Sequence, residues 1–95
     1  MFEWDAEKAA INFEKHGVGF EEASTAFEYA PITQRADDRR DYGEKRFISI
    51  GFSASRRFLT IVWTERGDNK RIISARPASR EERETYAQDH NTDFS

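Results

Sequence analysis

The stretch from residue 46 to residue 75 constrains the fold most, because three runs of strand-forming residues follow one another with only short polar links between them. The run 46–52 alternates and places Ile48, Ile50 and Phe52 on one face, whereas the run 57–64 is apolar on both faces and is typical of a central strand. The third run covers 70–75. Links this short leave no room for a crossover helix, so the pattern predicts an antiparallel meander.

Helix signals precede the meander. A short strand is predicted at 2–4, and Asp5 follows it as the N-cap of a helix that ends before Gly17. Helical spacing puts four apolar residues on one side of this helix, and we expect that side to face the sheet: Ala6, Ala9, Ala10 and Phe13. A second helix is predicted over about 20–29, and Pro31 prevents it from continuing.

The end of the chain carries a third helix signal. Ser79 and Glu82 have the spacing of a capping box, which predicts a helix through about residue 88 and a frayed tail over 89–95. Residues 35–46 have no apolar period and predict an exposed, mobile loop. The order strand, two helices, three or four antiparallel strands and C-terminal helix predicts a single α+β domain over residues 1–95.

Composition argues against several classes of protein. No segment of the 95 residues approaches the roughly 20 apolar residues of a membrane span, and the first residues lack the basic start of a secretory signal. The sequence has no cysteine and only two histidines, far apart, so neither a disulfide framework nor a structural zinc site is expected. We therefore expect a cytoplasmic protein with no cofactor, no metal and no membrane partner.

Charge is unevenly distributed along the chain. Residues 1–30 carry two basic and seven acidic groups, and residues 84–95 carry three acidic groups and no basic one. Residues 31–83 carry thirteen basic and eight acidic groups, and eleven of the thirteen are arginine. Arginine binds phosphate in a planar, two-pronged geometry, so this basic middle segment favours an RNA partner despite the net charge of −3. An ordinary solvated surface of mixed charge is the alternative.

Two separated blocks of sequence resemble the BrnT family of ribonuclease toxins. The first block matches the family pattern at the following positions: Phe2, Trp4, Asp5, Lys8, Asn12, Lys15, His16, Gly17, Val18, Phe20 and Ala23. The second block matches at Arg71, Ile72, Ile73, Ser74, Ala75, Arg76, Ala78, Arg83 and Tyr86. Between the blocks, Glu44, Arg46, Gly51 and the turn at 64–67 also fit, whereas residues 31–43 lie outside the resemblance.

The resemblance implies a RelE-like fold, with the order β-α-α followed by three or four strands and a C-terminal helix. It implies the toxin of a type II toxin–antitoxin system, an endoribonuclease that cleaves RNA without a metal ion and so inhibits translation and growth. It also implies a BrnA-like antitoxin of the ribbon-helix-helix class, through which alone the complex would bind operator DNA.

Four residues are candidates for the chemistry of RNA cleavage, which needs a base, an acid and cations around the phosphate. His16 is the first, because a histidine can take up or release a proton near neutral pH, although it can equally cap the end of its helix. Lys15 and Arg76 are candidate cations near the reacting phosphate. Glu65 is a candidate base, with a turn acid paired to Arg66 as the alternative.

Five further residues are candidates for binding RNA or its phosphates: Lys8, Arg46, Arg71, Arg80 and Tyr86. Lys8 shares a helix face with Lys15, which forms either a phosphate-binding ridge or an ordinary solvated face. Strand alternation puts Arg71 and Arg76 on opposite faces if no bulge intervenes. Arg80 alternatively pairs with Glu84, and Tyr86 alternatively anchors the last helix to the core.

Two other functions compete with an endoribonuclease. The first is a non-catalytic domain on the same scaffold that only holds an antitoxin. The second, direct reading of DNA, is disfavoured because the last helix mixes both signs of charge and ends acidic.

Overall fold

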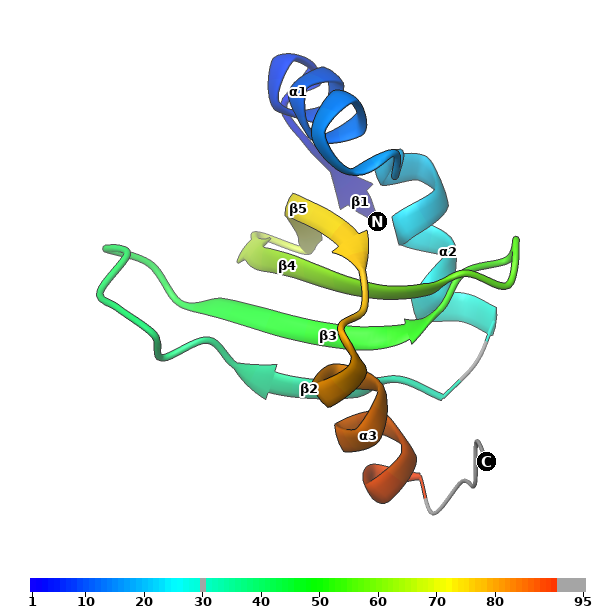
Figure 1. Ribbon diagram of the computed structural model, residues 1–95. Coiled ribbons are helices and arrows are strands. Elements are labelled where there is room, and N and C mark those ends of the chain that lie inside the picture. Colours follow the sequence, from blue (N-terminus) through cyan, green and yellow to red (C-terminus); the bar gives the residue numbers. More distant parts are fainter. Residues whose placement is uncertain (30, 91–95) are drawn as a thin grey trace.

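The computed structural model describes residues 1–29 and 31–90 and folds them around one five-stranded mixed sheet (Figure 1). The strands are β1 (Phe2–Glu3), β2 (Thr33–Ala36), β3 (Arg46–Phe52), β4 (Phe58–Arg66) and β5 (Asn69–Pro77), in the spatial order β1-β5-β4-β3-β2. The helices are α1 (Ala6–His16), α2 (Phe20–Tyr29) and α3 (Arg80–Asp89). The expected α+β class and element order are confirmed.

The sheet is antiparallel from β2 to β5, as the short links require, and β4 lies at its centre. The prediction of a wholly antiparallel sheet is wrong at one edge, where β1 pairs with the start of β5 in parallel. The two strands of this parallel pair are separated in the chain by both N-terminal helices and by the three strands β2, β3 and β4. β1 is two residues long, so it covers only Lys70 and Arg71 and leaves the rest of that side of β5 without a neighbouring strand.

Both capped helices begin where the sequence predicts. The Asp5 carboxylate accepts the backbone N–H of Lys8 at 3.0 Å, and Gly17 ends α1 with a φ of 70°. Ser79 and Glu82 form the reciprocal capping box at the start of α3. No helix within the described ranges is both long and apolar enough to cross a bilayer.

The two faces of the sheet carry separate apolar clusters. On one face α1 and α2 pack over a core that includes Phe20, Leu59, Ile61 and Trp63. On the other face α3 crosses in front of β3 and β2, away from the first two helices (Figure 1). Its Tyr86 packs with Ile48, Ile50 and Val62. Only one short helix covers this second face, so many side chains of the strands on this face are not covered by a helix.

The side of α1 that faces the sheet differs from the predicted one. Ala6, Ala10 and Phe13 are exposed, with Phe13 at 60%, and Ala9 alone of the four expected residues packs against the core. The buried residue of α1 is Asn12. Its amide donates to the carbonyls of Ala75 and Val18 at 2.8 and 3.0 Å, and its carbonyl accepts the N–H of Ala75 at 3.2 Å.

Asn12 therefore replaces a missing strand, because its amide group pairs with both backbone groups that Ala75 presents on the open side of β5. We expect Asn12→Ala to lower the free energy of unfolding by about 2–4 kcal/mol, since it leaves buried backbone groups without partners. Urea unfolding followed by tryptophan fluorescence measures the change. Ile11→Ala, on the exposed side of the same helix, is the control and should cost no more than about 0.5 kcal/mol. Equal effects of the two changes would contradict this role of Asn12.

The segment 35–46 is an exposed loop over most of its length, as its composition predicts, with strand residues at both ends. Its first two residues belong to β2, which pairs with β3, and the N–H of Asp37 extends the ladder to the carbonyl of Arg46 at 2.8 Å. Asp37 itself is buried and holds Arg39 through two hydrogen bonds of 2.7 and 2.8 Å. Of the tail predicted to fray, Asp89 ends α3 and His90 caps it, whereas residues 91–95 lie outside the described part of the chain.

Candidate functional site

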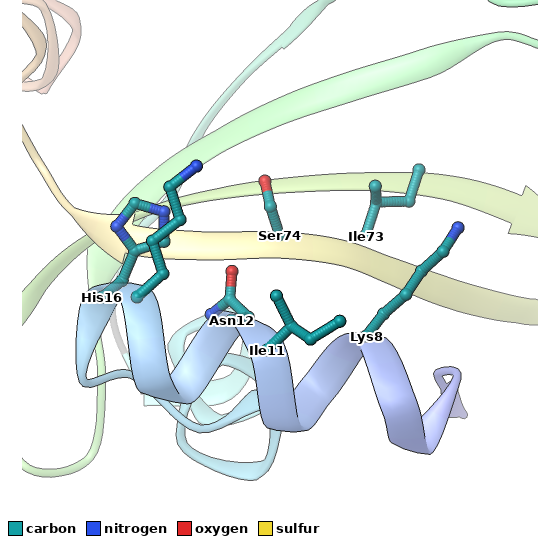
Figure 2. A pocket seen from close by; sticks show the side chains of 7 residues that line it. Lys8, Ile11, Asn12, His16, Ile73 and Ser74 are labelled. Atoms are coloured by element: carbon teal, nitrogen blue, oxygen red, sulfur yellow. The ribbon is translucent and has the colours of Figure 1, made fainter.

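A pocket of about 220 Å³ lies between α1 and the open side of β5. Figure 2 shows side chains from both elements converging on it. The lining residues are Lys8, Ile11, Asn12, Lys15, His16, Ile73 and Ser74. The pocket thus brings together three candidates that are spread over two turns of one helix, and it adds a serine hydroxyl from the strand.

The pocket exists because β1 is short and α1 ends beside β5. Beyond Arg71, β5 has no strand neighbour on this side. Helix α1 lies there instead, and the side-chain amide of Asn12 donates a hydrogen bond to the backbone carbonyl of Ala75 in β5. Residues at helical spacing from Asn12 then flank the opening: Lys8 lies one turn before it, and Lys15 and His16 lie one turn after it. Two lysine ammonium groups and an imidazole therefore border one opening in a strand edge.

A β-bulge determines where the strand arginines point. On β4, Thr60, Val62 and Thr64 alternate without interruption and so lie on one face. Their partners on β5 are, in the same order, Arg76, Ser74 and Arg71. The register shifts between Val62 and Trp63, which leaves Ile73 as the extra residue of β5. The sequence predicted opposite faces for Arg71 and Arg76 only if no bulge intervened. Because a bulge is present, both arginines lie on the same face of the sheet as Ser74.

The same register adds two arginines from the neighbouring strands. Arg46 pairs with Thr64 across β3 and β4, and Arg35 pairs with Ile48, which in turn pairs with Val62. We call this side of the sheet the arginine face, defined by Arg35, Arg46, Arg71 and Arg76. It is the face that α3 covers only in part, and the pocket opens at its β5 edge through Ser74.

Three arginines of this face are held by carboxylates. Arg71 donates to Glu3 at 2.7 Å, and Arg46 donates to Glu44 at 3.0 Å. Arg76 forms two hydrogen bonds with Glu82, of 2.6 and 2.7 Å. Such pairs orient a guanidinium group while leaving its outward N–H groups available to a ligand. The hydrogen bonds to the Glu82 carboxylate raise the pKa of Arg76, so its positive charge is secure.

Glu82 connects the arginine face to the start of α3. Burial raises the pKa of its carboxyl, but hydrogen bonds from Arg76 and from the backbone N–H of Ser79 outweigh that effect and lower the pKa to about 2. The carboxylate is therefore ionised at neutral pH. One side chain thus closes the capping box and fixes the direction of Arg76.

The other candidates lie elsewhere. Glu65 is exposed near the β4–β5 turn, on the face opposite to the arginine face, where it stands across from Lys70. Arg80 is exposed and pairs with Glu84 at 3.4 Å. Tyr86 is buried, and its hydroxyl donates to the carbonyl of Pro31 at 2.8 Å, which matches the anchoring alternative. The structure brings none of these three into the pocket.

Sequence reasoning missed two residues of this region. Ser74 lies inside a matched block, but strand periodicity alone does not tell which face a residue near a bulge will take. Asn12 was part of the same resemblance, and an asparagine within a helix that needs apolar packing was a usable signal of a buried amide.

The site can bind an anion and transfer a proton. Two lysines, an imidazole and a serine hydroxyl line the pocket, and Arg71 and Arg76 lie on the same sheet face as that serine. Within residues 1–29 and 31–90, no three side chains of the metal-binding kinds come together in a group that could hold an ion. The ammonium and guanidinium groups of this region suit a phosphate group as ligand.

Comparison with known proteins agrees with this chemistry. A family model described as the ribonuclease toxin BrnT of type II toxin–antitoxin systems matches residues 4–82. Among solved structures, the ribonuclease toxin BrnT of Brucella abortus is similar, with 21% identity over 84% of this chain and 99% of that chain and a TM-score of 0.61, which supports the fold. No curated protein matches the sequence. The chain belongs to the BrnT family of ribonuclease toxins of type II toxin–antitoxin systems.

Proposed function

We propose that the pocket between α1 and β5, together with the adjoining arginine face, is the site at which this toxin cleaves RNA, and that cleavage needs no metal ion. One observation carries the proposal: Lys8, Lys15 and His16 border the same opening, which leads onto a sheet face that carries four arginines. Glu65 and Arg80 are exposed and do not line this pocket.

Cleavage begins when a 2′-oxygen of the RNA attacks the neighbouring phosphorus. His16 takes the proton of that hydroxyl as the new oxygen–phosphorus bond forms. The bond from phosphorus to the 5′-oxygen of the next nucleotide then breaks, and that oxygen receives a proton from an acid at the site. The products are a 2′,3′-cyclic phosphate and a free 5′-hydroxyl. Lys15, one residue before His16, is the ammonium group closest in the chain to this proton transfer.

Positive charge lowers the barrier, because the phosphorane carries more negative charge than the phosphate from which it forms. Arg76 is the strand residue best placed for this role, since it lies two residues from Ser74 on the same face and Glu82 restricts its motion. Lys8 binds a non-bridging phosphate oxygen from the helix side. Arg46, Arg71 and Arg80 bind phosphates farther along the RNA, away from the phosphate that is cleaved.

The partner of a type II toxin is an antitoxin protein. We further propose a BrnA-like antitoxin of the ribbon-helix-helix class that supplies the DNA-binding surface of the complex in the cytoplasm. The charge of α3 supports this division, because its four acidic residues outnumber its two arginines and suit neither groove of DNA. A non-catalytic, antitoxin-holding domain remains the competing function, and RNA cleavage separates the two.

We expect the purified chain to cleave single-stranded RNA in the presence of excess EDTA, because its own cations neutralise the phosphorane. The measurement is the appearance of fragments with 2′,3′-cyclic phosphate ends on a denaturing gel. Arg76→Gln should slow the reaction by about 10- to 1,000-fold, in keeping with the loss of one group that stabilises a transition state. Intact RNA after incubation with folded protein would overturn the proposal, and cleavage abolished by EDTA would overturn its metal-free form.

A further inference from the structure

The nine residues that join β2 to β3 have no helix or strand, as their sequence predicts, but side-chain hydrogen bonds hold part of this loop in place. Buried Asp37 is its centre: it accepts both hydrogen bonds from the Arg39 guanidinium, one from the Arg39 backbone N–H and one from the Tyr42 hydroxyl. The hydrogen bonds from Arg39 lead the effects that lower the pKa of the Asp37 carboxyl to about 2, against a rise from burial. A buried carboxylate thus fixes the path of a segment whose residues 37–46 carry four basic and four acidic groups.

Arg39 turns back over the arginine face. It lines a pocket of about 370 Å³ with Arg35 and Ile48, two residues that register places on that face. Glu82 raises the pKa of Arg76, and the positive charge of Arg39 opposes that rise, which places the two guanidinium groups within electrostatic reach. Arg35 and Arg39 therefore meet at one pocket, which Asp37 and Asp38 also line.

Tyr42 arranges two further arginines at the outer side of the loop. The Arg46 guanidinium lies 4.2 Å and the Arg40 guanidinium 5.2 Å from the centre of its ring. Arg40 is exposed, and neither it nor Arg35 or Lys45 has a carboxylate partner within the described part of the chain. Cations without acidic partners beside an aromatic ring are what single-stranded RNA binds, through its phosphates and by base stacking on guanidinium planes.

We propose that the loop formed by residues 37–46 binds the RNA strand beside the phosphate that is cleaved, with Arg39 and Arg40 as its principal contacts. The proposal rests on the RNA-cleaving site proposed above and extends it to a second contact surface. Asp37 and Tyr42 are positioning residues, because they hold the arginines in place. Residues 37–43 of this loop lie outside the sequence blocks that carry the resemblance, whereas Glu44 and Arg46 fit it.

The test measures binding without cleavage. A single-stranded RNA with 2′-O-methyl groups cannot supply the attacking hydroxyl, and its binding is followed by fluorescence anisotropy at several salt concentrations. We expect Arg40→Gln to weaken binding roughly three- to tenfold and to reduce the slope of log affinity against log salt by about one. The control is Arg56→Gln, an exposed arginine in the turn at the opposite end of β3, which should leave both quantities unchanged.

The outcomes separate this proposal from the one on which it rests. Equal binding by the two variants, with wild-type protein that cleaves ordinary RNA, would overturn the role of the loop and leave the cleavage site intact. Weaker binding by Arg40→Gln, with wild-type protein that cleaves nothing, would support the loop and overturn the cleavage site. Asp37→Asn provides a second variant, because it keeps the side-chain shape and removes the charge that holds Arg39; it should weaken binding at least as much as Arg40→Gln.

Discussion

His16→Ala is expected to slow RNA cleavage by about 10²- to 10⁴-fold, the range that a general acid or base contributes. The imidazole stands at the rim of the pocket between α1 and β5, beside Lys15 and across from Ser74. Alanine removes the proton acceptor and leaves the surrounding cations in place, so RNA should still bind. Initial rates at saturating RNA measure the effect, and binding of the 2′-O-methyl RNA measures what remains of the site.

The control for this change is the second histidine. His90 caps α3, and its ring packs on Tyr86 at 4.4 Å between centroids, so His90→Ala removes an imidazole from the face of α3 and not from the pocket. We expect it to retain cleavage wherever the protein stays folded, as monitored by circular dichroism. A His16→Ala protein that is folded and cleaves at the wild-type rate would contradict the assignment of His16 as the base.

Local signals were enough to predict the elements of this fold. Asp5, Gly17 and Ser79 each act through hydrogen bonds or backbone conformation within a few residues, so the sequence alone places the ends of α1 and the start of α3. The meander followed from the shortness of its links. The parallel partner of β5 could not be predicted in this way, because β1 is two residues long and its partner is more than sixty residues away.

Helical spacing grouped Lys8 and Lys15, and the structure places both at one pocket together with His16. The arrangement of the strand arginines could not be predicted in the same way. A single extra residue, Ile73, reverses the alternation of β5 and brings Arg71 onto the face of Arg76. A bulge depends on pairing with the neighbouring strand, and the residue types within β5 do not predict it.

The face of α1 was predicted wrongly for a related reason. Periodicity assumes that a helix turns its apolar side to the sheet, but here the open side of β5 presents backbone groups that need hydrogen bonds. Asn12 satisfies them, and Phe13 is left exposed. The charged loop is exposed as predicted, but the hydrogen bonds that Asp37 accepts from Arg39 and Tyr42 could not be inferred from composition.

The protein is expected to lose stability steeply below about pH 4.5, because three carboxyls titrate at much lower pH in the folded chain than in the unfolded one. The guanidinium groups of Arg57 and Arg39 lead the effects that lower the pKa values of Glu22 and Asp37, and each pKa is about 2. The pKa of Glu82 is also about 2. The ordinary values are 4.5 for the two glutamates and 3.8 for the aspartate.

The sign follows from proton binding. Below pH 4.5 the unfolded chain begins to take up protons at these three sites, whereas the folded chain takes them up only near pH 2. The free energy of unfolding is therefore highest above pH 4.5 and falls as the pH is lowered toward 2, by at most about 1.4 kcal/mol per pH unit for each carboxyl. Because a small domain has only about 5–15 kcal/mol of stability, we expect acid unfolding within this window.

Glu82→Gln tests one of the three contributions separately, because glutamine can still complete the capping box while it cannot ionise. The variant should be less stable than the wild type at neutral pH and should show a shallower dependence of stability on pH, with about one proton fewer taken up on unfolding. Glu81→Gln, an exposed neighbour in the same turn of α3, should keep the wild-type slope. Urea unfolding at a series of pH values gives these slopes. Equal slopes for wild type and Glu82→Gln would mean that the pair with Arg76 does not lower the pKa of Glu82, and would remove the main reason for treating that arginine as held in place.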